Sequence, residues 1–287
     1  MSEMVFLNDR VVDARQAHIS LTDSGFLYGV GLFETMRSHD GVVFRLQDHL
    51  DRLLLSAAKL LAPHSYEKTH LEEAVQEVLQ ANELAEARLR LTLTNGPLMD
   101  AQEQPQPTLL ITATQFRPYP SEHYTAGVLV ILCPFRQNST DPTCGHKTTS
   151  YFPRLLALEM ARRKQAAEAL WFTQDNHLAE GCVSNIFLVK DSVLYTPTVE
   201  TPVLPGVARR TVLQLAGEQA IDAIEKDLTI ADVLEADEVF LTNVIMEALP
   251  VISVERHVVG DGKVGPVTRK LREAFLRAIA EQCGRKI

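Results

Sequence analysis

The chain has 287 residues, of which 46% are hydrophobic, so it can bury a substantial core and form one large or two medium domains. Its formal net charge of -9 and the lack of a Lys/Arg cluster argue against a nucleic-acid partner, which normally needs a basic face. No basic segment followed by an apolar run opens the chain, and no apolar stretch approaches membrane-spanning length. We therefore expect a cytoplasmic protein with no membrane partner.

Residues 5–12 predict two short strands around a turn. Further on, Gly29 and Gly31 interrupt a run that contains the aromatic residues Tyr28 and Phe33. These glycines form neither a P-loop nor the Gly-x-Gly-x-x-Gly nucleotide fingerprint. By themselves they indicate either a plain structural turn or a close approach of the backbone to a ligand.

A short strand is expected at residues 42–46, followed by a helix from Gln47. Apolar residues recur on one face of this helix: Leu50, Leu53, Leu54, Ala57, Ala58 and Leu61. Arg52 leaves the helix on its polar side. It is either a solvated or ion-paired arginine or a phosphate ligand, for which a planar guanidinium is well suited.

Two more elements follow in the N-terminal half. Thr69 and Glu72 match a capping box and predict the start of a second helix. Residues 88–94 alternate as a strand, with leucines on one face and Arg88 and Arg90 on the other. These two arginines either face solvent, as is common in half-exposed antiparallel strands, or bind a carboxylate.

The domain boundary is expected after a strand at residues 108–113, where Pro118 and Pro120 make a stiff, poorly helical connector. This gives a small N-terminal domain and a larger C-terminal domain. The expected bounds are residues 1–117, a linker at 118–126, and residues 127–287.

Lys147 lies between a strand-like apolar run at residues 128–133 and a helical pattern that begins at Phe152. A lysine at such a junction is useful in chemistry if burial removes its proton or if it forms a Schiff base with a carbonyl. Most lysines are solvated surface cations, so the position alone also allows that interpretation.

The remaining pattern predicts strands at residues 169–173, 186–189, 193–195 and 238–242, and a last helix from Val267. Gly206 precedes a helix that begins at Val207. The start of a helix presents free backbone N–H groups, which suit a phosphate, although an ordinary loop-to-helix transition has the same pattern. The four cysteines and nine histidines show no spacing typical of a metal site, so we expect reduced thiols and no metal.

Taken in order, segments along nearly the whole chain resemble the class IV pyridoxal-phosphate aminotransferases. This family includes branched-chain aminotransferases, D-amino acid aminotransferases and aminodeoxychorismate lyases. Besides Lys147, the matching segments are residues 29–37 (GVGLFETMR), 49–53 (HLDRL), 180–187 (EGCVSNIF), 195–197 (YTP), 204–209 (LPGVAR) and 240–243 (FLTN). Each motif is weak alone, and their common order carries the resemblance.

The resemblance implies an α+β, two-domain fold of fold-type IV, with a small N-terminal α+β domain and a larger C-terminal domain that has a β-barrel-like core. It implies pyridoxal 5'-phosphate bound between these domains. It also implies a homodimer.

The resemblance further assigns roles to single residues. Lys147 would be the Schiff-base lysine and the general base, and Glu180 would face the pyridine nitrogen and keep it protonated. The phosphate would be held by Arg52, the N–H groups of Val207 and Ala208, and the Thr242 hydroxyl. The other cofactor-binding residues implied are Tyr151, Ser184, Asn185, Leu204 and Gly206, and the substrate-side residues are Tyr28, Phe33, Arg88 and Arg90.

This chain departs from the family pattern at two of these positions. Ala208 stands where family members often have threonine, so only a backbone donor carries over there. Tyr151 follows Lys147 by four residues, whereas branched-chain enzymes place their ring-contacting tyrosine five residues after the lysine.

The expected function is an aminotransferase that exchanges an amino group between an amino acid, with branched-chain donors favoured, and a 2-oxo acid such as 2-oxoglutarate. Tyr28, Phe33 and the Leu204 segment suit an apolar side chain, and Arg90 suits a carboxylate. The alternatives are an aminodeoxychorismate lyase that releases pyruvate to give 4-aminobenzoate, and a D-amino acid aminotransferase. A cofactor-binding protein without catalysis is disfavoured because the chain has both Lys147 and Glu180. Binding alone would need only the phosphate contacts.

Overall fold

The computed structural model describes residues 3–61, 66–98 and 106–284. The chain divides into two compact units. Unit 1 comprises Met1–Arg117, His146–Tyr151 and Ile279–Ile287, and unit 2 comprises Pro118–Gly145 and Phe152–Ala278. Two segments that the sequence grouped with the C-terminal domain, residues 146–151 and 279–287, are thus assigned to unit 1. The predicted linker at residues 118–126 stays a prediction, and it contains the short helix α4 (Glu122–Thr125).

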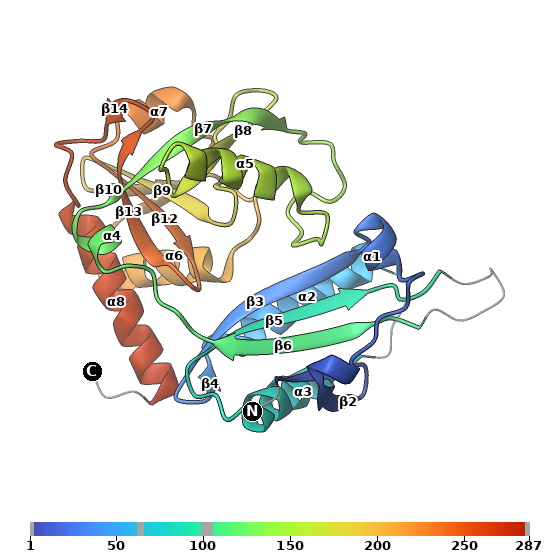
Figure 1. Cartoon of the computed structure of the whole chain (residues 1–287). Coiled ribbons are helices and arrows are strands. Elements are labelled where there is room, and N and C mark those ends of the chain that lie inside the picture. The colour runs from blue at the N-terminus through green and yellow to red at the C-terminus, as the bar shows by residue number, and fades with distance from the viewer. Residues whose placement is uncertain (1–2, 62–65, 99–105, 285–287) are drawn as a thin grey trace. The chain divides into compact units, whose positions relative to one another are not determined.

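Unit 1 is built on a six-stranded antiparallel sheet in the order β2-β1-β6-β5-β3-β4. Figure 1 shows β3, β5 and β6 side by side. The strands are β1 (Met4–Leu7), β2 (Arg10–Asp13), β3 (Gly31–His39), β4 (Val42–Val43), β5 (Ala87–Thr94) and β6 (Leu109–Gln115). The helical segments are η1 (Ala14–Gln16), α1 (Ser24–Tyr28), α2 (Leu46–Leu60) and α3 (Lys68–Ala81).

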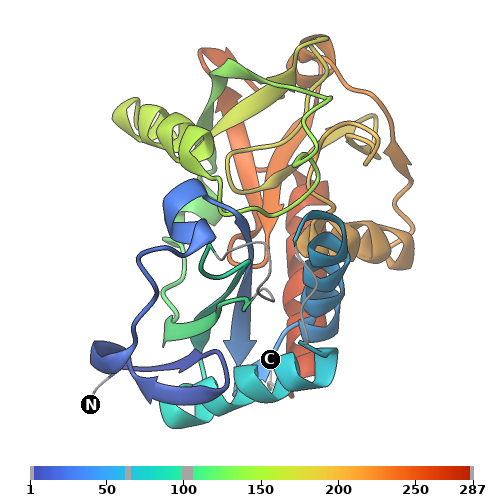
Figure 2. The ribbon, with the colours of Figure 1, turned by 90° about the vertical axis from the view of Figure 1, so that its right-hand side faces the viewer.

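Helices α2 and α3 cover one face of this sheet (Figure 2). The leucines of β5 point toward the helices because successive side chains of a strand alternate between faces, and Leu89 and Leu91 are fully buried there. On the helix side, residues spaced by three or four form the matching stripe, for example Leu50 and Leu53 of α2. The other face of β5 therefore carries Arg88, Arg90 and the threonines.

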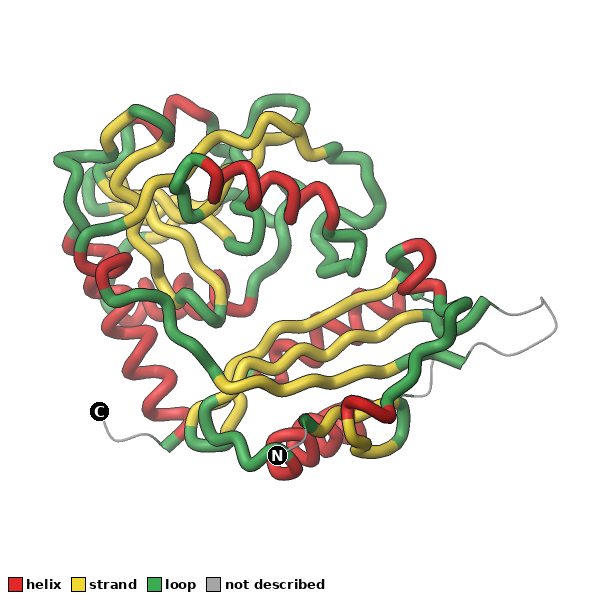
Figure 3. Tube along the Cα trace, viewed as in Figure 1, coloured by secondary structure: helices red, strands yellow, loops and turns green. Residues whose placement is uncertain are grey.

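Unit 2 is built on an eight-stranded sheet in the order β11-β10-β9-β12-β13-β7-β8, with β14 paired to β13. Its strands are β7 (Val128–Gln137), β8 (Glu168–Thr173), β9 (Asn185–Lys190), β10 (Val193–Thr196), β11 (Ala223–Glu225), β12 (Glu238–Asn243), β13 (Glu247–Val254) and β14 (His257–Val258). Its helices after α4 are α5 (Phe152–Arg163), α6 (Val207–Glu218), the short α7 (Ile230–Leu234) and α8 (Pro266–Cys283), whose residues from Ile279 on are assigned to unit 1. A long loop, green in Figure 3, precedes α5.

Among the described residues, two hydrophobic clusters contribute to the core of unit 2. The larger cluster lies around β9, β12 and β13, with Ile186 and Leu241 fully buried. The second cluster packs α5 against β7 and β8 through Ala157, Ala161 and Trp171. Together with the separate sheet of unit 1, this arrangement confirms the predicted α+β fold with two compact units.

Local predictions differ from the structure in two places. The capping box at Thr69 is wrong, since α3 already begins at Lys68 after Glu67, and no side chain caps its first turn. The strand predicted at residues 42–46 ends at Val43, because Arg45 adopts a left-handed backbone conformation with φ of 54° and α2 starts at the next residue.

Among the described residues, no helix combines the length and the apolar character needed to cross a bilayer. The same part of the chain holds no group of three or more His, Cys, Asp or Glu side chains able to bind a metal ion. All four cysteines lie among the described residues, and none of them forms a disulfide bond.

Candidate functional site

The Lys147 segment extends the sheet of unit 1 at the start of β3. The Phe33 N–H donates to the Lys147 carbonyl at 2.9 Å, and the Thr149 N–H donates to the Gly31 carbonyl at 2.8 Å. The Thr149 hydroxyl adds a bond of 2.7 Å to the carbonyl of Gly29. Three hydrogen bonds thus fix the chain at the lysine carbonyl and at Thr149, which explains why residues 146–151 belong to unit 1.

The Lys147 side chain lies against aromatic rings. Its Nζ is 4.5 Å from the centroid of the Phe33 ring and 5.6 Å from that of Tyr151. The two rings meet edge to face, with centroids 5.3 Å apart. The Arg90 guanidinium lies 3.8 Å from the Phe33 centroid. The structure thus brings together four residues that the sequence proposed: Lys147, Phe33, Tyr151 and Arg90. Partial burial and the charge of Arg88 lower the pKa of Arg90.

Arg52 forms a buried ion pair, not a solvated one. Its Nε and Nη2 donate to the two carboxylate oxygens of Glu34 at 2.8 and 2.5 Å. His49 Nδ1 lies 2.8 Å from the same carboxylate. Burial raises the pKa of Glu34, but the charge of Arg52 and the hydrogen bond of His49 outweigh it and hold the pKa at about 2. The carboxylate is therefore ionised and accepts hydrogen bonds from both partners.

Of the predicted substrate residues, Tyr28, Arg88 and Arg90 are exposed and Phe33 is buried. Tyr28 ends α1 and is 68% exposed, and Arg88 is exposed on the open face of β5.

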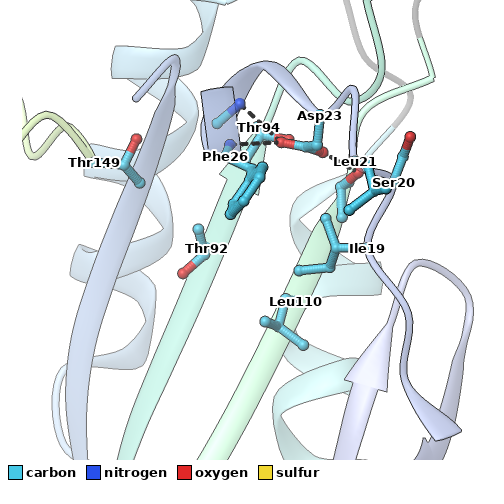
Figure 4. Close-up of a pocket in the computed structure, with 11 residues that line it drawn as sticks. Ile19, Ser20, Leu21, Asp23, Phe26, Thr92, Thr94, Leu110 and Thr149 are labelled. Carbon is cyan, nitrogen blue, oxygen red and sulfur yellow. Dashed lines mark hydrogen bonds between the residues drawn. The ribbon is translucent and has the colours of Figure 1, made fainter. Parts of the chain in front are cut away.

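Near α1, a cavity of about 330 Å³ is lined by Phe26, Leu110, Thr149 and their neighbours (Figure 4). Its buried carboxylate, Asp23, accepts hydrogen bonds from Thr94, Thr108 and two backbone N–H groups, so it anchors the wall of the cavity.

Within unit 2, the Glu180 carboxylate is held by several donors. Arg154 Nη2 donates to Oε1 at 2.5 Å. The Leu204 N–H donates to Oε2 at 3.0 Å, and the Asn185 amide lies 3.4 Å from the same oxygen. Asn185 also donates to the Leu204 carbonyl at 2.9 Å. Three predicted cofactor residues, Glu180, Asn185 and Leu204, therefore form one hydrogen-bonded group.

The start of α6 has the features of an anion site. Gly206 precedes the helix, and no side chain caps its first turn. A Cβ on Gly206 would collide with the Asn185 amide, so only glycine fits there. Elsewhere in unit 2, the Thr242 hydroxyl is buried and finds no hydrogen-bond partner among the described residues. Such an unpaired polar group is costly unless a ligand satisfies it, which fits a phosphate-bearing cofactor.

Ser184 is turned toward a second buried carboxylate, Glu168. The Ser184 hydroxyl donates to Glu168 at 3.2 Å, and the N–H groups of Cys182 and Val183 donate at 2.6 and 3.3 Å. Burial raises the pKa of Glu168 to about 7, although these hydrogen bonds lower it. The hydrogen bond from Ser184 to Glu168 thus helps to hold the loop that carries Glu180. The predicted contact of Ser184 with a cofactor stays a prediction.

Four ionisable residues of the site were not predicted from the sequence: Glu34, His49, Arg154 and Glu168. Glu34 and His49 lie inside the two N-terminal motifs, and a polar residue within an otherwise buried strand was the available signal for Glu34. Arg154 carried no comparable signal, because its pairing with Glu180 spans 26 residues and depends on how α5 packs on β8.

The chain matches known proteins along nearly its full length. The family model described as "Amino-transferase class IV" matches residues 31–254. A provisionally named branched-chain-amino-acid aminotransferase of Methanocaldococcus jannaschii is 34% identical over 94% of both chains. A D-alanine aminotransferase of Listeria monocytogenes is 29% identical over 98% of this chain and 97% of the relative.

Solved structures give the same result. The branched-chain amino acid aminotransferase of Escherichia coli superposes with a TM-score of 0.92 at 29% identity, covering 100% of this chain and 97% of the other. The branched-chain aminotransferase of Thermoproteus uzoniensis, solved with norvaline, gives a TM-score of 0.89 at 29% identity, covering 100% and 96%. A further branched-chain amino acid aminotransferase was solved with pyridoxamine 5'-phosphate. It superposes with a TM-score of 0.91 at 26% identity, and the match covers 100% of this chain and 96% of the other. The chain therefore belongs to the class IV aminotransferase family.

Proposed function

We propose that this class IV aminotransferase uses pyridoxal 5'-phosphate to exchange an amino group between a branched-chain amino acid and a 2-oxo acid such as 2-oxoglutarate. The observation that supports this most is the Lys147 segment, which two backbone hydrogen bonds join to β3 and which carries its amine beside Phe33 and Tyr151. The relatives named as branched-chain aminotransferases support the choice of donor.

Each of the two units carries residues whose chemistry fits the cofactor. In unit 2, the uncapped start of α6 and the buried Thr242 hydroxyl suit a phosphate, and Glu180 offers a fixed carboxylate. In unit 1, Arg52 offers a guanidinium of fixed orientation, which we assign as a ligand of the cofactor phosphate. When bound, the cofactor supplies the electron sink that makes the proton on the substrate α-carbon removable.

Lys147 is the residue to which we assign proton transfer. Its Nζ, once neutral, would take the proton from the α-carbon of the donor amino acid and, in the second half of the exchange, would give a proton to the α-carbon of the amino acid formed from the oxo acid. The Phe33 and Tyr151 rings place apolar surface beside this amine. Glu180 would keep the ring nitrogen of the cofactor protonated, and the hydrogen bonds from Leu204 and Arg154 fix the orientation of its carboxylate.

The substrate side of unit 1 combines an apolar surface with positive charge. Tyr28 is 68% exposed and offers an open aromatic surface that suits an aliphatic side chain, whereas Phe33 is buried beside Arg90 and Lys147. Arg90 and Arg88, on the strand next to Phe33, suit a carboxylate. This combination is what a branched-chain amino acid and 2-oxoglutarate require in turn.

The experiment follows the first half of the reaction in purified protein loaded with pyridoxal 5'-phosphate. Leucine, isoleucine or valine, added without an oxo acid, should remove the absorption band of the aldehyde form, and 2-oxoglutarate should restore it. Faster loss of the band with D-alanine than with the L-amino acids would favour the activity named for the Listeria relative. Release of pyruvate from aminodeoxychorismate, with no loss of the band from any amino acid, would overturn the proposal in favour of a lyase.

We also propose that the protein is a cytoplasmic homodimer. Large apolar side chains are exposed at α1 and α5, including Phe26 at 71%, Phe152 at 76% and Leu155 at 54%. A second copy of the chain would cover such surfaces. Light scattering during gel filtration should give twice the mass of one chain, and a monomer would contradict this part of the proposal.

A further inference from the structure

Glu34 is a buried carboxylate without a role in the proposed reaction. It lies in the middle of β3 and is 0% exposed. Both of its partners come from α2, where His49 and Arg52 are three residues apart and so lie on the same side of the helix. The side chain of His49 is 1% exposed and that of Arg52 is 11% exposed.

Burying three such groups in a strand-to-helix contact is costly unless each is satisfied by the others. The carboxylate satisfies Arg52 through two of its three guanidinium nitrogens. Because this contact is bidentate, it fixes both the plane and the direction of the guanidinium. An arginine without such a partner would sample many rotamers and would lose that freedom on binding a ligand.

His49 fixes the carboxylate in turn. Its Nδ1 is 2.8 Å from Glu34, and an ionised carboxylate only accepts, so this nitrogen carries the proton. Burial lowers the pKa of His49, Glu34 raises it, and the charges of Arg52 and Lys147 lower it further. The neutral imidazole thus acts as a fixed donor and adds no charge to the cluster.

We propose that Glu34 is a positioning residue, which holds Arg52 in the orientation that binds the phosphate of the cofactor. This inference rests on the proposed function, in which Arg52 is a phosphate ligand. The opposite effect is physically conceivable, since a carboxylate close to a phosphate repels it and lowers the net charge of the arginine. The sign of the change in phosphate affinity therefore decides between positioning and repulsion.

The test compares two ligands that differ only in the phosphate: pyridoxal 5'-phosphate and pyridoxal. Each is titrated into cofactor-free protein, and binding is followed by absorbance. For Glu34→Gln, the Kd of pyridoxal 5'-phosphate should rise about ten-fold, as expected for a weakened charge-assisted hydrogen bond. The Kd of pyridoxal should stay within about two-fold of the wild-type value, because the effect acts through the phosphate.

Glu238→Gln is the matched control. Glu238 is also a buried carboxylate, but it accepts hydrogen bonds from Val267 and Thr268 at the start of α8. Its loss should affect stability without changing the preference for the phosphate-bearing ligand. Equal weakening of both ligands in Glu34→Gln and Glu238→Gln would show a merely structural role and overturn the inference.

Arg52→Ala separates failure of the inference from failure of the proposed function. If Arg52→Ala weakens both ligands equally, Arg52 is no phosphate ligand and that part of the proposed function fails. If Arg52→Ala weakens only pyridoxal 5'-phosphate, while Glu34→Gln binds it as tightly as the wild type or more tightly, the inference alone is overturned. Should Glu34→Gln fail to fold, Glu34→Asp takes its place, and wild-type affinity in that variant overturns the inference.

Discussion

Glu180 shows how neighbouring protein groups hold one carboxylate in a fixed orientation. Its side chain is 5% exposed, and the Arg154 guanidinium, at 20% exposure, also donates to the Gly181 carbonyl at 3.0 Å. Arg154 therefore ties α5 to the loop that carries Glu180. Since a buried carboxylate without a partner is strongly unfavourable, Arg154 stabilises this orientation of Glu180.

Replacing Lys147 should abolish the covalent attachment of the cofactor to the chain. Lys147→Ala should leave no cofactor attached after borohydride reduction and denaturation, because the only amine assigned to a covalent link is gone. Mass spectrometry of the intact chain measures this attachment.

Lys190→Ala provides the control for this experiment, since Lys190 is half-exposed and pairs with Asp237. It should retain the attached cofactor as the wild type does. A reduced cofactor still found on the Lys147→Ala chain would show that a different lysine forms the link.

At the level of elements, the Lys147 segment behaves as a short extra strand at the start of β3. It lies next to a glycine-containing turn, and Gly29 adopts a positive φ of 70° that suits glycine. At Gly31, a Cβ would lie 2.9 Å from the Leu93 carbonyl oxygen, so the close packing of β3 on β5 requires glycine there. The two glycines therefore allow the chain to bring Lys147 and Phe33 together.

Thr149→Val should loosen this extra strand. The variant loses the hydroxyl bond to the Gly29 carbonyl and should lower the free energy of unfolding by about 1 kcal/mol. Urea unfolding measures the change. Thr148→Val is the matched control, because the Thr148 side chain makes no hydrogen bond within the described residues, and an equal loss in both variants would contradict the assignment.

At the level of the whole molecule, two buried carboxylates contribute to stability in opposite pH windows. The pKa of Glu34 is lowered to about 2, so its contribution is present above the unfolded value of about 4.3 and is lost as the pH falls toward 2. The pKa of Glu168 is raised to about 7, so its contribution is present below about 4.3 and is lost as the pH rises through 7.

Glu168→Gln should therefore change the pH dependence of stability. The amide resembles the protonated carboxyl and does not ionise, so the variant avoids the loss that the wild type suffers on raising the pH. Between pH 5 and pH 8 the wild type should lose about 3 kcal/mol of unfolding free energy relative to the variant.

Urea unfolding at both pH values measures this difference, with Glu218→Gln on the exposed end of α6 as the control. Parallel pH profiles for the wild type and Glu168→Gln would show that Glu168 does not titrate in this range.

The sequence by itself determined the elements whose periodicity is strong. The alternation of residues 88–94 gives β5 because every second side chain meets the same face, and the leucine spacing gives α2 to within one residue of its observed start. The order of the motifs also determined the family. These features depend on local geometry or on residue type, both of which are present in the sequence.

Only the tertiary structure decided which residues meet across long stretches of chain. Periodicity gave Arg52 a polar face of its helix, whereas packing of α2 on β3 buries it against Glu34, 18 residues earlier in the chain. The Lys147 segment joins unit 1 because its backbone pairs with β3, and no local pattern encodes that pairing. Such contacts arise from the register of strands and the packing of helices, so they require the folded chain.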